Sequence, residues 1–242
     1  MSSFRICQIT DIHITLKQDQ TIDGIDVISN FERTLEKIVQ YSPDLLVLSG
    51  DLCFTKNDKI IYPIVKEKLD STGLDYCVMA GNHDKTKPLA KAFNYNIIGR
   101  DLYYTRDLDQ YRLIFTDSSR HKISTSQLAS LSRDLKTDRQ PVVFMHHPPV
   151  LAGVPFMDRK YPLRNRDTIQ NVLGEYKGDI PVFCGHYHHE KEFIHKNLHI
   201  YMTPSTYFQI SDQNIHFEVF SKKPGWRNIT LSNKIESQVI YL

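Results

Sequence analysis

The sequence contains few cysteines and no long apolar run. Its four cysteines, among 242 residues, are widely spaced and form no CxxC pair, so a zinc site built from thiolates is not expected. Buried, reduced thiols are the simpler interpretation. No apolar stretch has the length that a membrane-spanning helix needs, and a strand pattern begins at Phe4, which leaves no room for the apolar part of a signal peptide. We therefore expect a cytoplasmic protein without a membrane span.

The chain also lacks an excess of charge of one sign. Thirty Lys and Arg residues against 28 Asp and Glu residues leave a formal net charge of +2. Nucleic-acid-binding domains usually carry a clear basic excess, so a nucleic acid partner is not expected, although a local basic loop is compatible with this balance. The 40% hydrophobic content can fill a large core, and neither a repeat nor a linker is visible. We expect residues 1–242 to form a single domain.

Short apolar runs alternate with helical patterns along the chain. Strands are predicted at 4–9, 45–48, 76–79, 102–106, 112–116, 141–145 and 181–184, then around Phe193 and Ile200, at 217–220 and at 239–242. Helices are predicted at 27–41, at 59–69 with Asn57 or Asp58 as the cap, from Ser124 to Leu135, and near 167–173. A loop containing proline and arginine is expected after Pro149. This alternation predicts an α/β protein.

Five of the apolar runs end at small groups of Asp, Asn and His residues. In chain order the groups are Asp11-Ile12-His13, Gly50-Asp51, Gly81-Asn82-His83-Asp84, His146-His147-Pro148 and Gly185-His186-Tyr187-His188. Strand ends in open α/β sheets converge in a crevice where sites are built. Each group alone is a weak signal, since a glycine-aspartate pair after a strand is usually a turn. The ordered set is much more specific.

This set resembles the signature of the calcineurin-like metallophosphoesterase family, which reads D-x-H, G-D, G-N-H-D or G-N-H-E, H-x-P and G-H-x-H. The resemblance extends to about residue 210, and no ligand position departs from the pattern. It implies two mixed β-sheets packed as a sandwich and flanked by helices, with the site along one edge. Periodicity alone does not distinguish this arrangement from a plain three-layer α/β fold.

The resemblance also implies a pair of metal ions bridged by Asp51. For the first ion it implies the further ligands Asp11, His13 and His188. For the second ion it implies Asn82, His146 and His186. Nitrogen and oxygen ligands favour two divalent or trivalent ions of Mn, Fe, Zn or Co over a thiolate zinc site. Two such ions can share a hydroxide that attacks phosphorus in line with the leaving oxygen. The resemblance therefore implies a metal-dependent phosphoric ester hydrolase.

Side chains beside the ligands receive roles from the same resemblance. His83 would stabilise the developing charge or protonate the leaving alkoxide, and Asp84 could orient it. His146 and His147 compete for one ligand position. The H-x-P spacing selects His146, and alternation along an extended segment sends the two side chains to opposite faces. By the same alternation His189 is expected to be a bystander.

The other histidines and one aspartate give weaker signals. Polar or alternating surroundings favour ordinary surface or partly buried positions for His121, His195, His199 and His216. Asp117, at the end of a predicted strand, is equally compatible with a support for the site and with a simple turn.

Two further stretches resemble the class III 3′,5′-cyclic-nucleotide phosphodiesterase branch of the family. They are His146-His147-Pro148-Pro149 followed by Gly153, Asp158, Leu163 and Asn165, and Thr203-Pro204-Ser205-Thr206-Tyr207-Phe208-Gln209. The second stretch could instead be a strand entry with proline and hydroxyl residues. Arg164 in the first stretch could bind a phosphate, although a solvated basic loop is the default. Tyr187 could stack on a base, although such aromatic side chains more often only pack.

The expected activity is hydrolysis of 3′,5′-cyclic AMP to 5′-AMP by attack of the bridging hydroxide. One alternative is a phosphodiesterase or pyrophosphatase for acyclic substrates, such as glycerophosphodiesters or nucleotide-lipid compounds. Another is a non-catalytic scaffold of the same fold, and the seven retained ligand positions weigh against it. The expected partner is a small-molecule phosphodiester, and the oligomeric state is open, with a homodimer allowed.

Overall fold

The computed structural model describes the whole chain except residues 1–2, 16–20, 22 and 57–58. Its elements follow one another in the order β1 (Phe4–Ile9), α1 (Val27–Tyr41), β2 (Leu45–Leu48), α2 (Ile61–Ser71), β3 (Tyr76–Val78), α3 (Thr86–Ala92), β4 (Tyr104–Leu108), β5 (Tyr111–Thr116), α4 (Thr125–Asp134), β6 (Gln140–Met145), α5 (Pro155–Lys160), α6 (Arg166–Leu173), β7 (Ile180–Cys184), β8 (Lys191–His195), β9 (Leu198–Met202), β10 (Gln209–Ile210), β11 (Val219–Ser221), β12 (Gly225–Leu231) and β13 (Ile235–Tyr241). No helix among the described residues is both long and apolar enough to cross a bilayer.

Two large mixed sheets form the centre of the molecule. The first has the strand order β13-β12-β1-β2-β3, with β1, β2 and β3 parallel, β12 antiparallel to β1, and β13 antiparallel to β12. The second has the order β4-β5-β6-β7-β9-β8, with parallel strands in the middle and an antiparallel strand at each edge. Strands β10 and β11 form a separate two-stranded ribbon.

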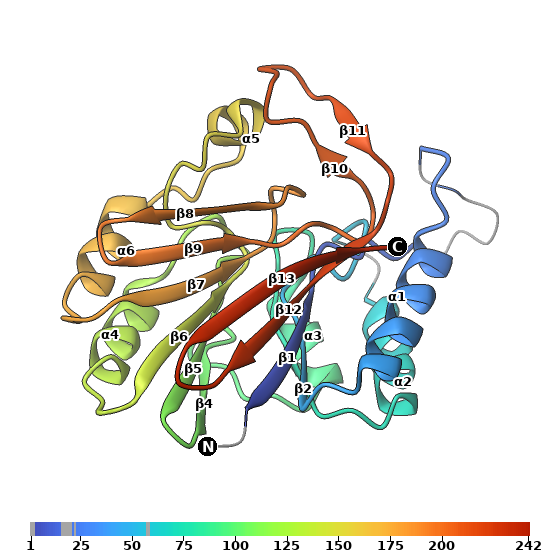
Figure 1. Cartoon of the computed structure of the whole chain (residues 1–242). Coiled ribbons are helices and arrows are strands. Elements are labelled where there is room, and N and C mark those ends of the chain that lie inside the picture. Colours follow the sequence, from blue (N-terminus) through green and yellow to red (C-terminus); the bar gives the residue numbers. More distant parts are fainter. Residues whose placement is uncertain (1–2, 16–20, 22, 57–58) are drawn as a thin grey trace.

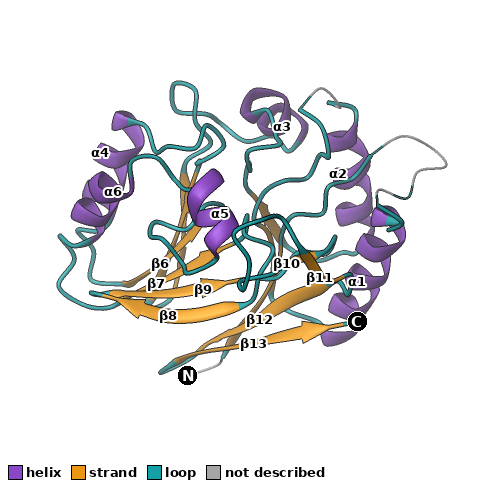
Figure 2. Ribbon diagram, turned by 90° about the horizontal axis from the view of Figure 1, so that it is seen from above, coloured by secondary structure: helices purple, strands orange, loops and turns teal. Residues whose placement is uncertain are grey.

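The sheets are flanked by helices on their outer faces. Figure 2 shows α1 and α2 on one side of the molecule and α4 and α6 on the other, with the sheets between them. Helix α1 fits this position because its buried residues Val27, Phe31, Leu35 and Ile38 recur every three or four positions. Asp26 caps the helix by accepting a hydrogen bond from the Ser29 amide at 2.9 Å. The fold class expected from the family resemblance is confirmed.

Side-chain alternation along the strands explains the sandwich. In β2, Leu45 and Val47 belong to the apolar cluster between the sheets, whereas Leu46 and Leu48 belong to the cluster that includes the helices. The inner face of the second sheet also carries a row of stacked rings, with centroids 4.6–5.3 Å apart: Tyr104, Phe115, Phe144, Phe183 and Tyr201. Both faces of the central strands are therefore buried, as their continuous apolar runs predict.

The bounds of several elements differ from the sequence predictions; for example, β13 begins at Ile235, four residues before the predicted start. Strand β4 lies two residues later than predicted, because it pairs with β5 up to Leu108 opposite Tyr111 and leaves only two residues for the turn. Helix α2 likewise begins and ends two residues later than predicted. Its expected caps, Asn57 and Asp58, lie outside the described residues.

Four elements were not predicted, among them the two-residue strand β10. Helix α5 replaces part of the expected loop and begins at Pro155, a residue that favours the first helical position. Helix α3 is another short helix, with seven residues and a proline at position 88. Strand β12 joins the C-terminal hairpin to β1, and it contributes buried Trp226 and Ile229 to the core.

Candidate metal centre

All seven expected ligands lie at one edge of the sandwich. Each follows the carboxyl end of a parallel strand: β1, β2 and β3 in the first sheet, and β6 and β7 in the second. Two groups of close, buried side chains result, Asp11 with His13 and His188, and Asp51 with His146 and His186. Asn82 joins the second group through its Oδ1 atom, 3.2 Å from His146 Nε2. We call these seven residues the floor of the site.

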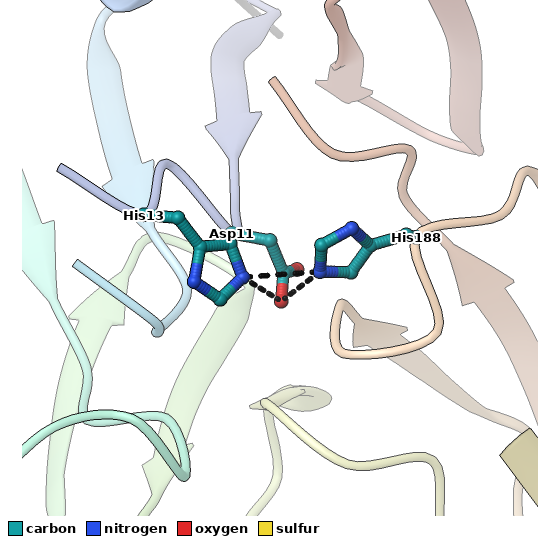
Figure 3. Close-up of side chains that lie close together, drawn as sticks. All are labelled: Asp11, His13 and His188. Carbon is teal, nitrogen blue, oxygen red and sulfur yellow. Dashed lines mark hydrogen bonds and ion pairs between the residues drawn. The ribbon is translucent and has the colours of Figure 1, made fainter. Parts of the chain in front are cut away.

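The first group converges on one point, as Figure 3 shows. Asp11 Oδ1 lies 3.2 Å from His188 Nε2 and 3.9 Å from His13 Nε2, and the two imidazole nitrogens are 3.1 Å apart. Ligand atoms bonded to one metal ion at about 2.1 Å are separated by about 3.0–3.5 Å, depending on the coordination geometry. The spacing therefore fits a metal ion held by these three side chains.

Asp51 lies between the two groups. Its Oδ2 atom is 3.4 Å from His146 Nε2 and 3.8 Å from His13 Nε2. A carboxylate that faces ligands of both groups occupies the position of a bridge. Its other oxygen accepts a hydrogen bond from the His83 amide at 2.7 Å, which fixes the carboxylate.

Backbone carbonyls orient three of the four histidines in the floor. The ring nitrogen that faces away from the site lies 2.9–3.1 Å from a carbonyl oxygen in each of three pairs: His146 Nδ1 with Ser49, His186 Nε2 with Tyr161, and His188 Nδ1 with Phe208. A carbonyl accepts only from a protonated nitrogen, so the other nitrogen of each ring keeps its lone pair for the site. Metal-binding histidines are commonly held in this way.

The burial of the floor makes it a suitable cation site. Asp11 Oδ1 is a buried atom without a hydrogen-bond partner among the described residues, and an unpaired buried carboxylate oxygen is costly. The pKa of Asp51 is raised by burial but, on balance, held well below its usual range by His146 and by other histidines nearby. Two buried carboxylates beside four imidazoles and one amide form a donor set that fits a pair of metal ions.

The pKa values of the floor histidines also fit a cation site. Burial lowers the pKa of His13 and of His186 to about 3, so both rings are neutral, as metal ligands must be. Burial acts in the same sense on His146, but Asp51 and Asp11 outweigh it and raise the pKa of His146 to about 9. Negative charge is therefore concentrated around this ring, where a cation would displace the proton.

The backbone of the floor is strained. Five of the seven residues have positive φ angles of 46–66°: Asp11, His13, Asp51, His186 and His188. Residues other than glycine adopt this region rarely, at about 1–3 kcal/mol each, and such residues cluster at functional sites. These backbone conformations direct nearby side chains of one short loop into the same site.

Two of the motif glycines are required by close approach of neighbouring loops. A Cβ atom at Gly185 would lie 2.0 Å from Thr10 Oγ1, and one at Gly81 would lie 2.2 Å from Asp51 Oδ1. Neither position can hold a side chain without moving a loop that carries a ligand. This explains the glycine that precedes Asn82 and the glycine that precedes His186.

The segment 203–209 supports the floor from behind. Ser205 Oγ donates to the Asp11 carbonyl at 2.8 Å, and the Thr206 amide donates to the Thr10 carbonyl at 3.3 Å. The next two residues, Tyr207 and Phe208, line the cavity over the metal site. Only the last residue of the segment, Gln209, lies in a strand. The segment therefore leads into β10, as the alternative from the sequence expected, and it also supports the floor.

Asp84 does not orient His83 as expected. The His83 ring is held by the Phe54 carbonyl, 2.7 Å from Nδ1. Asp84 is buried and accepts hydrogen bonds from the backbone amides of Leu52, Cys53 and Gly81 at 2.9–3.3 Å. The turn that closes with a hydrogen bond from the Asp84 amide to the Gly81 carbonyl directs the carboxylate to the loop after β2. Asp84 therefore ties the loops of Asp51 and Asn82 together.

Tyr187 is not placed to stack on a substrate. Its side chain is 1% exposed, and its hydroxyl donates to Asp158 at 2.8 Å. Its neighbours in the motif, His186 and His188, face the site instead, so alternation sends Tyr187 into the core. Tyr187 and Asp158 thus join the last ligand loop to α5.

His147 does not turn away from the site. The chain bends after Met145, so strand alternation no longer applies, and the His147 ring lies against His186 with centroids 3.9 Å apart. Its Nδ1 atom is 2.8 Å from Ser118 Oγ, and its Nε2 atom is 3.1 Å from His121 Nδ1. His121 is consequently part of this side of the site, which the sequence did not indicate.

His189 and Asp117 occupy peripheral positions. His189 Nδ1 lies 2.8 Å from the Ile210 carbonyl, outside the floor. Asp117 accepts from the Leu102 amide at 3.0 Å and from Thr86 Oγ1 at 2.7 Å. Asp117 therefore holds the start of α3, behind the loop that carries Asn82.

Two hollows with different linings adjoin the floor. A cavity of about 380 Å³ is bordered by what we call the aromatic wall: Phe54, Phe156, Tyr161, Tyr207, Phe208 and Phe217. The second hollow is bordered by what we call the cationic wall, Lys56, Lys160 and Arg164, with His121 beside it. Phe54 and Tyr161 of the aromatic wall line both hollows, as do Asn82 and His83, so the two hollows adjoin each other beside the metal site.

Residues 4–190 match the calcineurin-like phosphoesterase family. The chain belongs to this family. A "probable cyclic nucleotide phosphodiesterase" of Fibrobacter succinogenes is 32% identical over 240 residues, which cover 98% of this chain and 93% of that protein. The 3′,5′-cyclic adenosine monophosphate phosphodiesterase CpdA of Escherichia coli is 27% identical over 94% of this chain and 85% of its own length.

Two further similarities bear on this calcineurin-like phosphoesterase. A "probable glycerophosphodiester phosphodiesterase GpdQ" of Arcobacter nitrofigilis is 26% identical over 76% of this chain and 71% of that protein. The crystal structure of a dimetal phosphatase from Danio rerio has the same fold, with a TM-score of 0.70, 13% identity and 98% coverage of both chains. The expected resemblance to the family and to its cyclic-nucleotide phosphodiesterase branch is confirmed.

Proposed function

We propose that this protein is a two-metal phosphodiesterase that hydrolyses 3′,5′-cyclic nucleotides, with cyclic AMP converted to 5′-AMP. One observation carries the proposal: two groups of buried ligands, joined by Asp51, lie beneath a cavity with an aromatic wall. A cyclic nucleotide would place its phosphate on the floor and its base against that wall. Relatives named as cyclic-nucleotide phosphodiesterases support the same substrate class.

The floor would hold both ions in the arrangement implied by the family. Asp11, His13 and His188 would bind the first ion, Asn82, His146 and His186 the second, and Asp51 both. Bound metal ions of this kind supply an activated water nucleophile and offset negative charge on the phosphoryl oxygens. Mn, Fe, Zn and Co are the proposed metals because all donors are nitrogen or oxygen. A crystal structure of metal-loaded protein should show two ions with Asp51 between them.

His83 is the side chain proposed to act on the leaving oxygen. The Phe54 carbonyl fixes the proton of the ring on Nδ1, so Nε2 can donate a proton only when the ring is charged. His83 also lines both hollows beside Asn82, the region that a bound phosphate would fill. It would stabilise the charge on the phosphoryl group or give a proton to the departing alkoxide. Arg164 remains a proposed substrate-binding residue on the cationic wall.

Acyclic diesters are a second candidate substrate class. A relative is named as a probable glycerophosphodiester phosphodiesterase, and the floor itself does not require a cyclic ester. A non-catalytic role is disfavoured because all seven ligand positions are retained and gathered. We treat residues 1–242 as one domain, since the C-terminal hairpin β12–β13 completes the first sheet. The cytoplasmic location and the homodimer stay predictions.

The test is a substrate panel with protein loaded in turn with Mn, Fe, Zn or Co. The values of kcat/KM for cyclic AMP, bis(p-nitrophenyl) phosphate and glycerophosphocholine should show that cyclic AMP is a substrate. The generic diester should also be cleaved, because its good leaving group needs little help from a general acid. Cleavage of this diester without cleavage of cyclic AMP would refute the cyclic-nucleotide assignment and leave the phosphodiesterase assignment intact.

A further inference from the structure

The cationic wall adjoins the floor and holds more cations than the single phosphate group of a cyclic mononucleotide requires. Lys56, Lys160 and Arg164 are exposed and line the same hollow as Asn82 and His83. Cyclic AMP carries one phosphate group, which the floor would bind. The three cations beside the floor are therefore suited to bind a second anionic group.

The positive surface extends beyond this hollow. Lys56 also lines a neighbouring hollow, whose described lining residues include four further cations, Lys59, Lys85, Lys87 and Arg100, and Arg120, which is ion-paired with the buried Asp101. Asp84 is the carboxylate among these described residues, and it is buried against backbone amides. Clustered cations with few acids raise the local concentration of anions and bind phosphate through charge-assisted hydrogen bonds.

This charge is concentrated on one side of the site. The formal net charge of the whole chain is only +2, and the described lining of the adjoining cavity includes aromatic side chains, Asp23 and Asp51 but no Lys or Arg. On the cationic side, burial lowers the pKa of His121, and the charges of Lys56 and Arg164 lower it further. The two walls thus differ in the chemistry that they can bind: a flat ring on one side and an anion on the other.

We propose that the cationic wall binds a second phosphate group, so that the protein also hydrolyses short linear nucleotide diesters that carry a phosphate beyond the scissile one. The inference rests on the proposed phosphodiesterase activity of the same floor. A base of the substrate would lie against the aromatic wall, the scissile phosphate on the floor, and the additional phosphate beside Lys56, Lys160 and Arg164. A 5′-phosphorylated dinucleotide, pApA, has this composition.

The reaction consumes one water molecule. A new bond forms between the water oxygen and phosphorus, the bond between phosphorus and the 3′ oxygen of the first ribose breaks, and that oxygen takes a proton. The products of pApA are two molecules of 5′-AMP. The same step on ApA gives adenosine and 5′-AMP, so the two substrates differ only in the terminal phosphate.

The comparison of pApA with ApA isolates the additional phosphate. We expect metal-loaded protein to have a kcat/KM for pApA at least about tenfold above that for ApA, the effect of one or two charge-assisted hydrogen bonds. The double variant Lys56→Ala/Arg164→Ala should reduce this ratio to about one. Lys37→Ala, which removes an exposed cation from α1, is the matched control and should keep the ratio. Equal kcat/KM values for pApA and ApA in the unmodified protein would overturn the inference.

Binding provides a readout that does not depend on turnover. Calorimetry with adenosine 3′,5′-bisphosphate should give a Kd at least about tenfold below those of 5′-AMP and 3′-AMP, and the double variant should lose this preference. The protein could cleave bis(p-nitrophenyl) phosphate but bind adenosine 3′,5′-bisphosphate no more tightly than 5′-AMP and 3′-AMP. This result would refute the second phosphate site and leave the phosphodiesterase activity standing. If no diester is cleaved but the preference is present, the activity is refuted and the second phosphate site stands.

Discussion

The floor and the two walls of the site are built in different ways. The floor residues are all buried, and carbonyl oxygens or strained backbone hold them in place. The walls carry exposed side chains, such as Phe217 at 51% and Tyr161 at 45% exposure. A rigid, buried floor determines the class of reaction, whereas exposed walls from separate loops determine which ester is presented to it. Changes in the floor should therefore have far larger effects than changes in the walls.

Removal of the Asp51 carboxylate, the proposed bridge between the ions, should have the largest effect. In Asp51→Ala we expect kcat/KM for every diester to fall at least about 10³-fold, because both ions lose a ligand and the charge of the site changes. Metal analysis of the purified variant should show fewer than two ions per chain. His199→Ala is the control, because it removes a partly exposed histidine of β9 and leaves the floor intact. Full metal content with undiminished activity in Asp51→Ala would show that the floor is not the reaction centre.

Substitution of His83 should separate catalysis from metal binding within the same small region. His83→Ala should lower kcat by about 10²–10⁴-fold, the usual contribution of a positioned proton donor, while both ions are retained. Asn82→Ala, one residue away, should lose metal because it removes a ligand. The measurement is kcat together with metal content for the two variants. If His83→Ala loses metal as readily as Asn82→Ala, His83 is part of the ligand set.

The same difference between floor and walls explains what the sequence could predict. The floor was predictable because its residues are rare types at consecutive strand ends, and parallel strands bring their carboxyl ends to one edge. Asp84 and His147 were misplaced because their loops bend after the strand, so that alternation no longer sets the direction of a side chain. The strain that places Asp11 and His188 in the site is likewise not visible in a pattern.

The walls could not be predicted because they join separate segments of the chain. Lys56, His121 and Arg164 meet only after two sheets have packed, and in the sequence each is an ordinary polar residue. A net charge of +2 conceals this cluster, since composition does not report where charges gather. The short helix α5, which carries Phe156 of the aromatic wall, begins at a proline that sequence patterns assign to a loop.

A change in the aromatic wall should affect substrate binding alone. Phe217→Ala should raise KM for cyclic AMP by about three- to tenfold, the lower end of base stacking on a ring, since Phe217 is half exposed. The value of kcat should change little, and KM for glycerophosphocholine, which has no base, should be unaffected. Phe220→Ala is the matched control, because Phe220 is exposed in the adjacent strand β11 but does not line the described cavity. Equal effects of the two variants would exclude Phe217 from the binding of the base.

The smallest effect should be the discrimination between bases. Aromatic rings stack on adenine and guanine alike, whereas selection of one base needs hydrogen bonds to its edge, each good pair contributing about 1–3 kcal/mol. The cavity is lined mainly by rings, and Asp23, beside the Tyr207 hydroxyl, is the acidic group of its described lining that lies outside the floor. We therefore expect kcat/KM for cyclic AMP and cyclic GMP to lie within about tenfold of each other. A ratio above about 100-fold would show that the wall reads the base edge, and Asp23→Ala would then be the variant that tests whether its carboxylate accepts a hydrogen bond from the preferred base.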